Sequence, residues 1–278
     1  MALKSSELKL RSQFFSLFDG FFNCANHVER LFRKVVVLAF ENFFESFNGV
    51  FDFNVFTGRA GELLVRFRDD ITAFDGVKKD VLTRKGSYNA QVSARLFSLL
   101  EEHQIRTHFI RLIDECSMLV RELEMVPLEV IVRNIAAGSM VRNYPIEEGT
   151  PLDPPVIVID YKDDARHDPM LNDDLILALK IVTTEELSLI KEIALKTNTV
   201  LSRFFAERGI TLVDFKIEFG RDNGTLVIGD EISMDSMRLW DAGSGASLDK
   251  DVYRFDKGDV LEVYRQVTER SLDRGEKT

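Results

Sequence analysis

Cysteine is scarce in this chain: only Cys24 and Cys116 occur among its 278 residues. Two thiols give no disulfide framework, and with four scattered histidines they lack the spacing of a structural zinc site. No apolar stretch reaches the roughly 18 uncharged residues that a transmembrane helix requires. These absences predict a protein of a reducing compartment, the cytoplasm, with no membrane partner.

Positive charge is also in short supply, because 36 Lys and Arg face 46 Asp and Glu and leave a net charge of −10. This balance argues against a general nucleic-acid binder, although a local basic pocket can still hold a small anion. Hydrophobic residues make up 45% of the chain and charged residues 29%, as in globular proteins. A chain of this length can bury the core of one large domain or of two lobes.

Familiar phosphate-binding loops are missing as well. No G-x-x-x-x-G-K-[ST] sequence occurs, and "GSGASL" at 243–248 lacks a third glycine and a strand–helix context. The first 56 residues are unusual in holding 13 of the 22 Phe, with six basic and six acidic residues. Their basic and apolar start resembles a targeting peptide, but Glu7 and Asp19 interrupt it and no cleavage site follows. We therefore expect no targeting segment.

Hydrophobic periodicity predicts an α+β protein with antiparallel sheets. Strands are expected at 61–70, 117–139, 154–164 and 214–233, and helices at 86–105, 183–209 and 258–272. Thr183 and Glu186 predict a capping box at the start of one helix, and Gly209 predicts its end. Pro127 cannot donate a ladder hydrogen bond, so we expect it to break 117–139 into two strands.

The segment "DFKIEFGRDNGTLVIGDEIS" at 214–233 is predicted to form a hairpin around its Asp-Asn-Gly turn. A three-residue loop would pair Arg221 with Thr225. A two-residue loop would instead send Asp230 to the phenylalanine face of the hairpin, where burial of its charge is costly. We therefore expect the three-residue loop.

That register would place Lys216, Glu218 and Asp230 on one face. Two carboxylates held this close repel each other unless a cation lies between them. Mg²⁺ prefers oxygen ligands and often combines one or two carboxylates with substrate phosphates. The hairpin is therefore compatible with a Mg–nucleotide site. It is equally compatible with a solvated charged face carrying surface ion pairs.

Three other segments carry side chains suited to anions. In "VRNIAAGSMVR" at 132–142, Arg133 and Ser139 flank small residues that permit close backbone approach, although a packed turn with an exposed arginine explains them too. "DYKDDARHDP" at 160–169 places charges at a strand end, or forms a polar loop. "RKGSYNAQ" at 84–91 offers a weak phosphate cradle at a helix start.

Seven segments, taken in order and spacing, closely resemble the SAICAR (phosphoribosylaminoimidazole-succinocarboxamide) synthetase family from about residue 54 to 272. They are "DDITAFDG", "KGSYNAQVS", "PLEVIVRNIAAGS", "YKDDARHDPMLNDD", "VDFKIEFG", "GDEISMDSMRLWD" and "LDKDVYRFDKGDV". The resemblance implies an ATP-dependent ligase of de novo purine synthesis. Such an enzyme joins L-aspartate to carboxyaminoimidazole ribotide through an acyl phosphate and gives SAICAR, ADP and phosphate.

The same resemblance implies a two-lobed α+β fold, distantly similar to kinases, with ATP in a cleft between the lobes. An atypical segment would span 1–53, an ATP-binding lobe 54–126, and a lobe for substrate and Mg²⁺ 127–278. Family members are often homo-oligomers, so a homo-oligomer is possible here.

Site residues are implied by the resemblance in five groups. Glu218 and Asp230 would hold Mg²⁺ and contact ATP. Lys216 and Lys162 would act near the transferred phosphate or the carboxylate. Ribotide anchors would be Arg133, Ser139 and Arg238. The substrate cleft would be bordered by Asp70, Lys85 and Asn89. The adenine would contact Glu124, Met125 and Val126.

The chain departs from the family pattern near its start. The family carries E-G-K-[AT]-K about twenty residues before "DD", whereas "GVFDFNVFT" at 49–57 has no lysine there and brings in Asp52. One hypothesis is that residues 1–53 are not a native start; the alternative is a genuine divergent extension. Two competing functions follow: an impaired member that binds ribotide without efficient turnover, or another ATP-dependent enzyme such as a small-molecule kinase.

Overall fold

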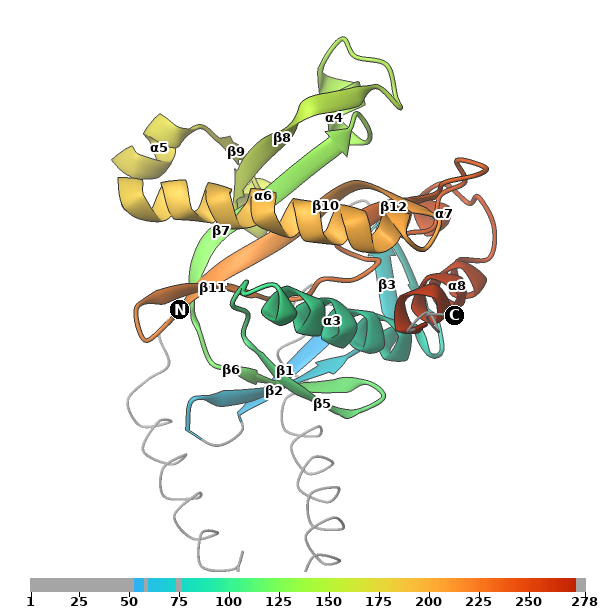
Figure 1. Cartoon of the computed structure of the whole chain (residues 1–278), viewed down its shortest axis with the longest axis horizontal. Coiled ribbons are helices and arrows are strands. Elements are labelled where there is room, and N and C mark those ends of the chain that lie inside the picture. Colours follow the sequence, from blue (N-terminus) through green and yellow to red (C-terminus); the bar gives the residue numbers. More distant parts are fainter. Residues whose placement is uncertain (1–52, 58–59, 74–76, 274–278) are drawn as a thin grey trace, which may run out of the picture. The chain divides into compact units, whose positions relative to one another are not determined.

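The computed structural model describes residues 53–57, 60–73 and 77–273 (Figure 1). The chain divides into two compact units, Met1–Val50 and Phe51–Thr278, and every described residue belongs to the second. Asp52 and the phenylalanine-rich segment before it lie outside the described residues. Among the described helices, none combines the length and apolar character needed to cross a membrane.

One antiparallel sheet has four strands in the order β1-β2-β6-β5. Its strands are β1 (Phe53–Thr57), β2 (Glu62–Phe67), β5 (Phe109–Asp114) and β6 (Ser117–Arg121). Helix α3 (Lys85–Glu102) packs on this sheet and against α8 (Val260–Leu272). A separate hairpin joins β3 (Asp70–Ala73) to β4 (Lys78–Val81).

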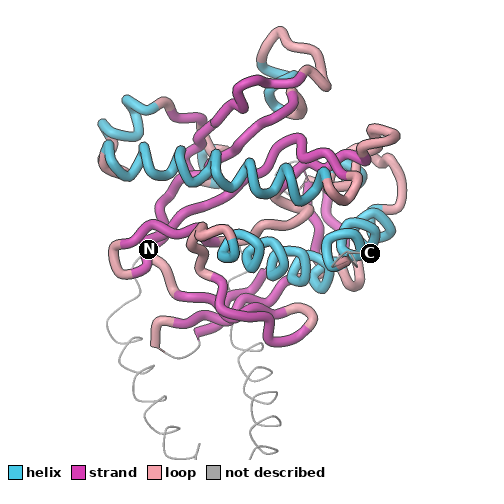
Figure 2. Tube along the Cα trace, viewed as in Figure 1, coloured by secondary structure: helices cyan, strands magenta, loops and turns pink. Residues whose placement is uncertain are grey.

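A second sheet has six strands, also paired antiparallel, in the order β11-β10-β7-β8-β9 with β12 added to β10. Its strands are β7 (Glu124–Ile135), β8 (Pro151–Tyr161), β9 (Met170–Leu171), β10 (Ile210–Asp222), β11 (Thr225–Gly229) and β12 (Met237–Asp241). Figure 2 shows helix α6 (Thr184–Ala206) running across this sheet. The predicted α+β class with antiparallel sheets is confirmed.

Short helical segments connect these strands. They are α4 (Ser139–Asn143), the 3₁₀ turn η1 (Asp164–Arg166), α5 (Asp173–Ala178) and α7 (Asp251–Arg254). The predicted capping box of α6 is present: Glu186 N donates to Thr183 Oγ1 at 3.2 Å, and Thr183 N donates to Glu186 Oε2 at 2.9 Å. Two backbone donors at the helix start are thereby satisfied, as the sequence pattern predicts.

The predicted hairpin register is wrong. Asp222 pairs with Thr225, so the turn contains only Asn223 and Gly224. Both turn residues have positive φ, +49° and +80°, as the tight turns that suit twisted strands require. Asp230 nevertheless avoids the phenylalanine face, because β11 ends at Gly229 and Asp230 itself has a φ of +59°. The chain therefore leaves the strand before the alternation of side chains can bury this carboxylate among phenylalanines.

The predicted break at Pro127 is also wrong, since β7 continues through it and the gap between strands falls at residues 122–123. The register between β7 and β10 shifts at this point: Glu129 faces Glu218, whereas Met125 faces Gly220. The proline thus sits at a bulge, where a missing ladder donor is tolerated. Its carbonyl still accepts a hydrogen bond of 3.1 Å from Lys162 N.

Candidate active site

One face of the six-stranded sheet carries several of the polar side chains that the sequence singles out. Glu218 of β10 faces Glu129 of β7, which in turn faces Asp160 of β8. Four residues further along, in the same alternation, Arg133 of β7 faces Asp214 of β10, which faces Arg238 of β12. Directly paired residues project to the same side of a sheet, so these rows lie on a common face.

Lysines and carboxylates interlock in the first row. Lys162 Nζ lies 2.9 Å from Glu129 Oε1 and 2.6 Å from Glu218 Oε1. Lys216 Nζ donates to the same Glu129 oxygen at 2.6 Å. Glu129 is buried and serves both amines, yet sequence reasoning missed it. Its signal was a lone acid within the apolar stretch of β7.

The pKa values in this row move apart. Burial works against ionisation of Glu129, but the charges of Lys216 and Lys162 outweigh it and lower the pKa. Burial, reinforced by the charge of Asp230, raises the pKa of Glu218 to about 7. Burial and the neighbouring Glu129 raise the pKa of Asp160 to about 6. One face therefore holds carboxyl groups with well-separated proton affinities.

Glu218 and Asp230 are the candidate metal ligands. Burial raises the pKa of Asp230 as well, while the charges of Lys216 and Lys162 act in the opposite direction. Asp230 raises the pKa of Glu218, so the two carboxylates form a site where a divalent cation would be stabilising, and oxygen donors suit Mg²⁺. Within the described residues, no three or more His, Cys, Asp or Glu side chains are grouped to hold a metal by themselves. The pair therefore fits a cation whose other ligands come from substrate or water.

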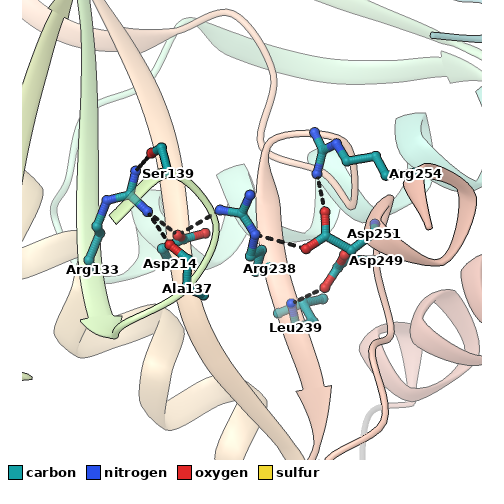
Figure 3. A network of polar contacts seen from close by, with 9 residues as sticks. All are labelled: Arg133, Ala137, Ser139, Asp214, Arg238, Leu239, Asp249, Asp251 and Arg254. Carbon is teal, nitrogen blue, oxygen red and sulfur yellow. Dashed lines mark hydrogen bonds and ion pairs between the residues drawn. The ribbon is translucent and has the colours of Figure 1, made fainter. Parts of the chain in front are cut away.

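A chain of arginines and acids forms the second row (Figure 3). Arg133 Nη2 donates to Ser139 Oγ at 3.0 Å, and its Nη1 donates to Asp214 Oδ2 at 2.8 Å. The same Asp214 oxygen accepts from Arg238 Nη1 at 2.8 Å. Two guanidinium groups are thus brought together around one buried carboxylate. The structure joins the three predicted ribotide anchors, Arg133, Ser139 and Arg238, through an Asp214 that sequence reasoning did not single out.

Predicted cleft residues Lys85 and Asn89 meet Asp235 in a separate buried network. Lys85 pairs with Asp235 Oδ2, and Asn89 Nδ2 donates to the same oxygen at 2.8 Å. Tyr264 OH donates to Asp235 Oδ1 at 2.5 Å. Burial works against ionisation of Asp235, but Lys85 and Lys250 outweigh it and hold the pKa of that carboxyl well below its usual range. Asp70, the third predicted cleft residue, pairs with Arg68.

The predicted adenine contacts lie at the start of β7. Met125 is exposed, and Val126 is buried. Just before them, Leu123 packs closely on Gly220: a Cβ added to Gly220 would lie 2.7 Å from the Cβ of Leu123. A cavity of about 650 Å³ opens beside this point and is lined by Gly61, Arg121, Glu122, Leu123, Glu124, Asp222 and Asn223. Glu124 is the predicted residue that lines it.

Comparison with known proteins identifies the family. The SAICAR synthetase family model matches residues 53–271. This chain belongs to the SAICAR synthetase family. The match begins at Phe53, beside the point where sequence analysis places the departure from the family pattern.

Individual relatives carry the same name. A phosphoribosylaminoimidazole-succinocarboxamide synthase of Methanoregula boonei is 68% identical over 77% of this chain and 84% of its own length. Among solved structures, a SAICAR synthetase in complex with ADP is 47% identical, with a TM-score of 0.78 over 80% of this chain and 95% of that one. The synthase of Ehrlichia chaffeensis is 38% identical, with a TM-score of 0.79 over 81% and 97%.

Proposed function

We propose that the chain is the ATP-dependent ligase that joins L-aspartate to the carboxylate of carboxyaminoimidazole ribotide and gives SAICAR, ADP and phosphate. The observation that carries the proposal is the shared sheet face, on which an arginine row adjoins a lysine–carboxylate row. An arginine pair suits the phosphate of a ribotide, and the adjoining row suits a reacting carboxylate and a nucleotide. Family membership supplies the reaction that uses both.

The chemistry follows from the poor reactivity of a carboxylate toward amines. The ribotide carboxylate oxygen attacks the γ-phosphorus of ATP, and the bond from that phosphorus to ADP breaks. The aspartate amine then attacks the acyl carbon, its proton is lost, and the carbon–oxygen bond to phosphate breaks. Lys162 and Lys216, which share the row with Glu129 and Glu218, would offset negative charge on the transferred phosphoryl group. Arg133, Ser139 and Arg238 would hold the ribotide so that its carboxylate meets that group.

Glu218 and Asp230 are the residues that would hold Mg²⁺. When bound, the ion supplies charge neutralisation along the ATP phosphates. Lys162 already contacts Glu218, so this lysine and the metal ion would share the Glu218 carboxylate. Lys85, Asn89 and Asp70 would border the substrates from α3 and β3, where Lys85 and Asn89 are held by Asp235.

The proposal extends to how the substrates are arranged. ATP would lie between a lobe of residues 54–126, which contains the four-stranded sheet, and a lobe of residues 127–278, with its adenine near Glu124, Met125 and Val126. Strand β7 passes through the boundary between these lobes and links them. The chain would work in the cytoplasm, where its substrates are small molecules, and could do so as a homo-oligomer.

The decisive experiment measures ADP release by the full chain with ATP, Mg²⁺, L-aspartate and carboxyaminoimidazole ribotide, each omitted in turn. We expect release that requires every component and SAICAR as the product. ADP release that persists without aspartate would overturn the ligase in favour of a kinase. Ribotide binding without any release would point to the impaired family member, which nothing in the comparisons favours.

A further inference from the structure

We propose that Asp251 is a positioning residue that holds the guanidinium of Arg238 in the orientation needed to bind the ribotide phosphate. The inference rests on the proposed function, because it takes Arg238 as a ribotide anchor. Asp251 lies at the start of α7, outside the sheet face that carries the other anchors (Figure 3).

Arg238 is held from two sides. Its Nε donates to Asp251 Oδ2 at 2.9 Å, and its Nη1 donates to Asp214 Oδ2 at 2.8 Å. A guanidinium is planar, so fixing Nε on one acid and Nη1 on another fixes the whole plane. Burial works against the charge on Arg238, but Asp214 and Asp251 outweigh it and keep its pKa well above the usual range.

Gly138 closes the third side of the guanidinium. A Cβ built on this residue would lie 2.4 Å from Arg238 Nη2 and 2.6 Å from its Cζ. The guanidinium therefore lies directly against the backbone beside Ser139, another predicted anchor, with Nη2 facing Gly138. Among the described residues, Asp251 is the group that accepts the hydrogen bond of Arg238 Nε.

Asp251 is itself firmly seated. Its Oδ1 accepts from Arg254 Nη1 at 2.6 Å, and its backbone N donates to Asp249 Oδ1 at 2.6 Å. The other oxygen of Asp249 accepts from Leu239 N at 2.8 Å, next to Arg238 on β12. The fully buried Asp249 thus ties the start of α7 to the strand that carries Arg238. Such bracing lets one carboxylate set the direction of an arginine rather than follow it.

The test is a double-mutant cycle on the full chain, read as the dissociation constant of carboxyaminoimidazole ribotide by calorimetry without ATP. We expect Asp251→Ala to weaken ribotide binding about tenfold, the usual scale for a charge-assisted hydrogen bond. The Arg238→Lys variant lacks the guanidinium Nε that donates to Asp251, so Asp251 can no longer orient this side chain. If Asp251 acts through Arg238, adding Asp251→Ala to Arg238→Lys should change the constant by less than about twofold.

Two controls separate positioning from general damage. The KM for ATP of Asp251→Asn, which keeps the side-chain shape, should stay close to that of the wild type and so show that the rest of the site is intact. Asp173→Asn removes another carboxylate bound by a cation, Lys191 at 2.6 Å, but on an exposed surface, and should leave ribotide binding unchanged.

The outcomes are distinct. Wild-type ribotide affinity in Asp251→Ala and Asp251→Asn, or an equal loss of affinity in both arginine backgrounds, would overturn the inference and leave the proposed function intact. A wild-type chain that neither binds ribotide nor releases ADP would overturn the proposed function, and this inference with it.

Discussion

Lys162 and Glu218 come from segments that are not neighbours in the sheet, yet Lys162 Nζ lies 2.6 Å from Glu218 Oε1. Lys162 follows β8 and Glu218 belongs to β10, and both strands pair with β7, which lies between them. The lysine therefore reaches across a whole strand and contacts Glu129 of β7 on the way, at 2.9 Å. One amine ties three strands together at the site.

The Glu129→Gln variant should lose stability at neutral pH. The change leaves the amines of Lys162 and Lys216 without the carboxylate they share, at a cost of about 1–3 kcal/mol for a partly buried pair. Since the folded pKa of Glu129 is below its usual 4.5, its contribution is present above that pH and lost as pH falls through the folded value. Urea unfolding of the wild type and of Glu129→Gln at pH 7 and pH 4 should show a smaller difference in unfolding free energy at pH 4. The exposed Glu192→Gln change should cost nothing at either pH.

The Glu218→Gln variant should need more Mg²⁺. Loss of one of two carboxylate ligands should raise the Mg²⁺ concentration for half-maximal ADP release at least about tenfold, since even indirect partners of a metal cost that much. The readout is a Mg²⁺ titration at saturating ATP. If the Mg²⁺ concentration for half-maximal ADP release were unchanged, Glu218 would not be a metal ligand.

Gly138→Ala should weaken ribotide binding, whereas Gly209→Ala should not. Both glycines have similar positive φ values, +57° and +66°, so both alanines carry a backbone strain of about 1–3 kcal/mol. Only at Gly138 does the new Cβ meet Arg238; nothing lies within 4 Å at Gly209. Calorimetric ribotide titration of the two variants isolates the displacement of Arg238 from the strain. If the two variants bound ribotide with equal affinity, Arg238 would be shown to move aside for the new Cβ without loss of binding.

Asp249 should make the folded state less stable as the pH rises toward neutrality. Burial, together with the charge of Asp251, raises its folded pKa to about 7 from a usual 3.8. The folded protein then holds this proton more tightly than the unfolded chain, so the unfolding free energy falls between these two pH values and levels off above them. Denaturation measured between pH 5 and pH 8 should show that the unfolding free energy of Asp249→Asn falls less steeply with pH than that of the wild type. The pKa values of Asp160 and Glu218 are also raised, so part of the fall in unfolding free energy with pH should remain in the variant. If the variant shows the same pH dependence as the wild type, Asp249 is not a source of it.

Local patterns were sufficient to predict most of the elements. The capping box of α6 depends on residues three apart. The predicted closeness of Lys216, Glu218 and Asp230 agrees with the influence of Asp230 and Lys216 on the pKa of Glu218. The register behind that grouping was wrong, because the sequence does not reveal that Asp230 adopts a left-handed conformation and leaves the strand. Pro127 misled for a similar reason: a bulge accommodates it.

Partners brought from far along the chain were beyond such reasoning. Asp214 and Asp251 matter because β12 returns to pair with β10 and α7 bonds back to β12, and only three-dimensional pairing shows this. The sequence predicts Lys85 at a helix start that could cradle a phosphate, whereas in the structure it is fully buried against Asp235, 150 residues later. The charge of a residue indicates that it needs a partner, and the fold determines which partner it receives.

Strand β10 pairs with β7 over Asp214–Arg221 on one side and with β12 and β11 on the other, and between those two partners Lys216 N donates to Ser236 O at 2.7 Å. It carries Asp214, Lys216 and Glu218, so three site groups sit on a segment with no free sheet edge. Such a segment exchanges its amide hydrogens only when large parts of a protein open together. The spacing of these groups cannot drift through local breathing, and the site keeps its dimensions until cooperative unfolding removes it altogether.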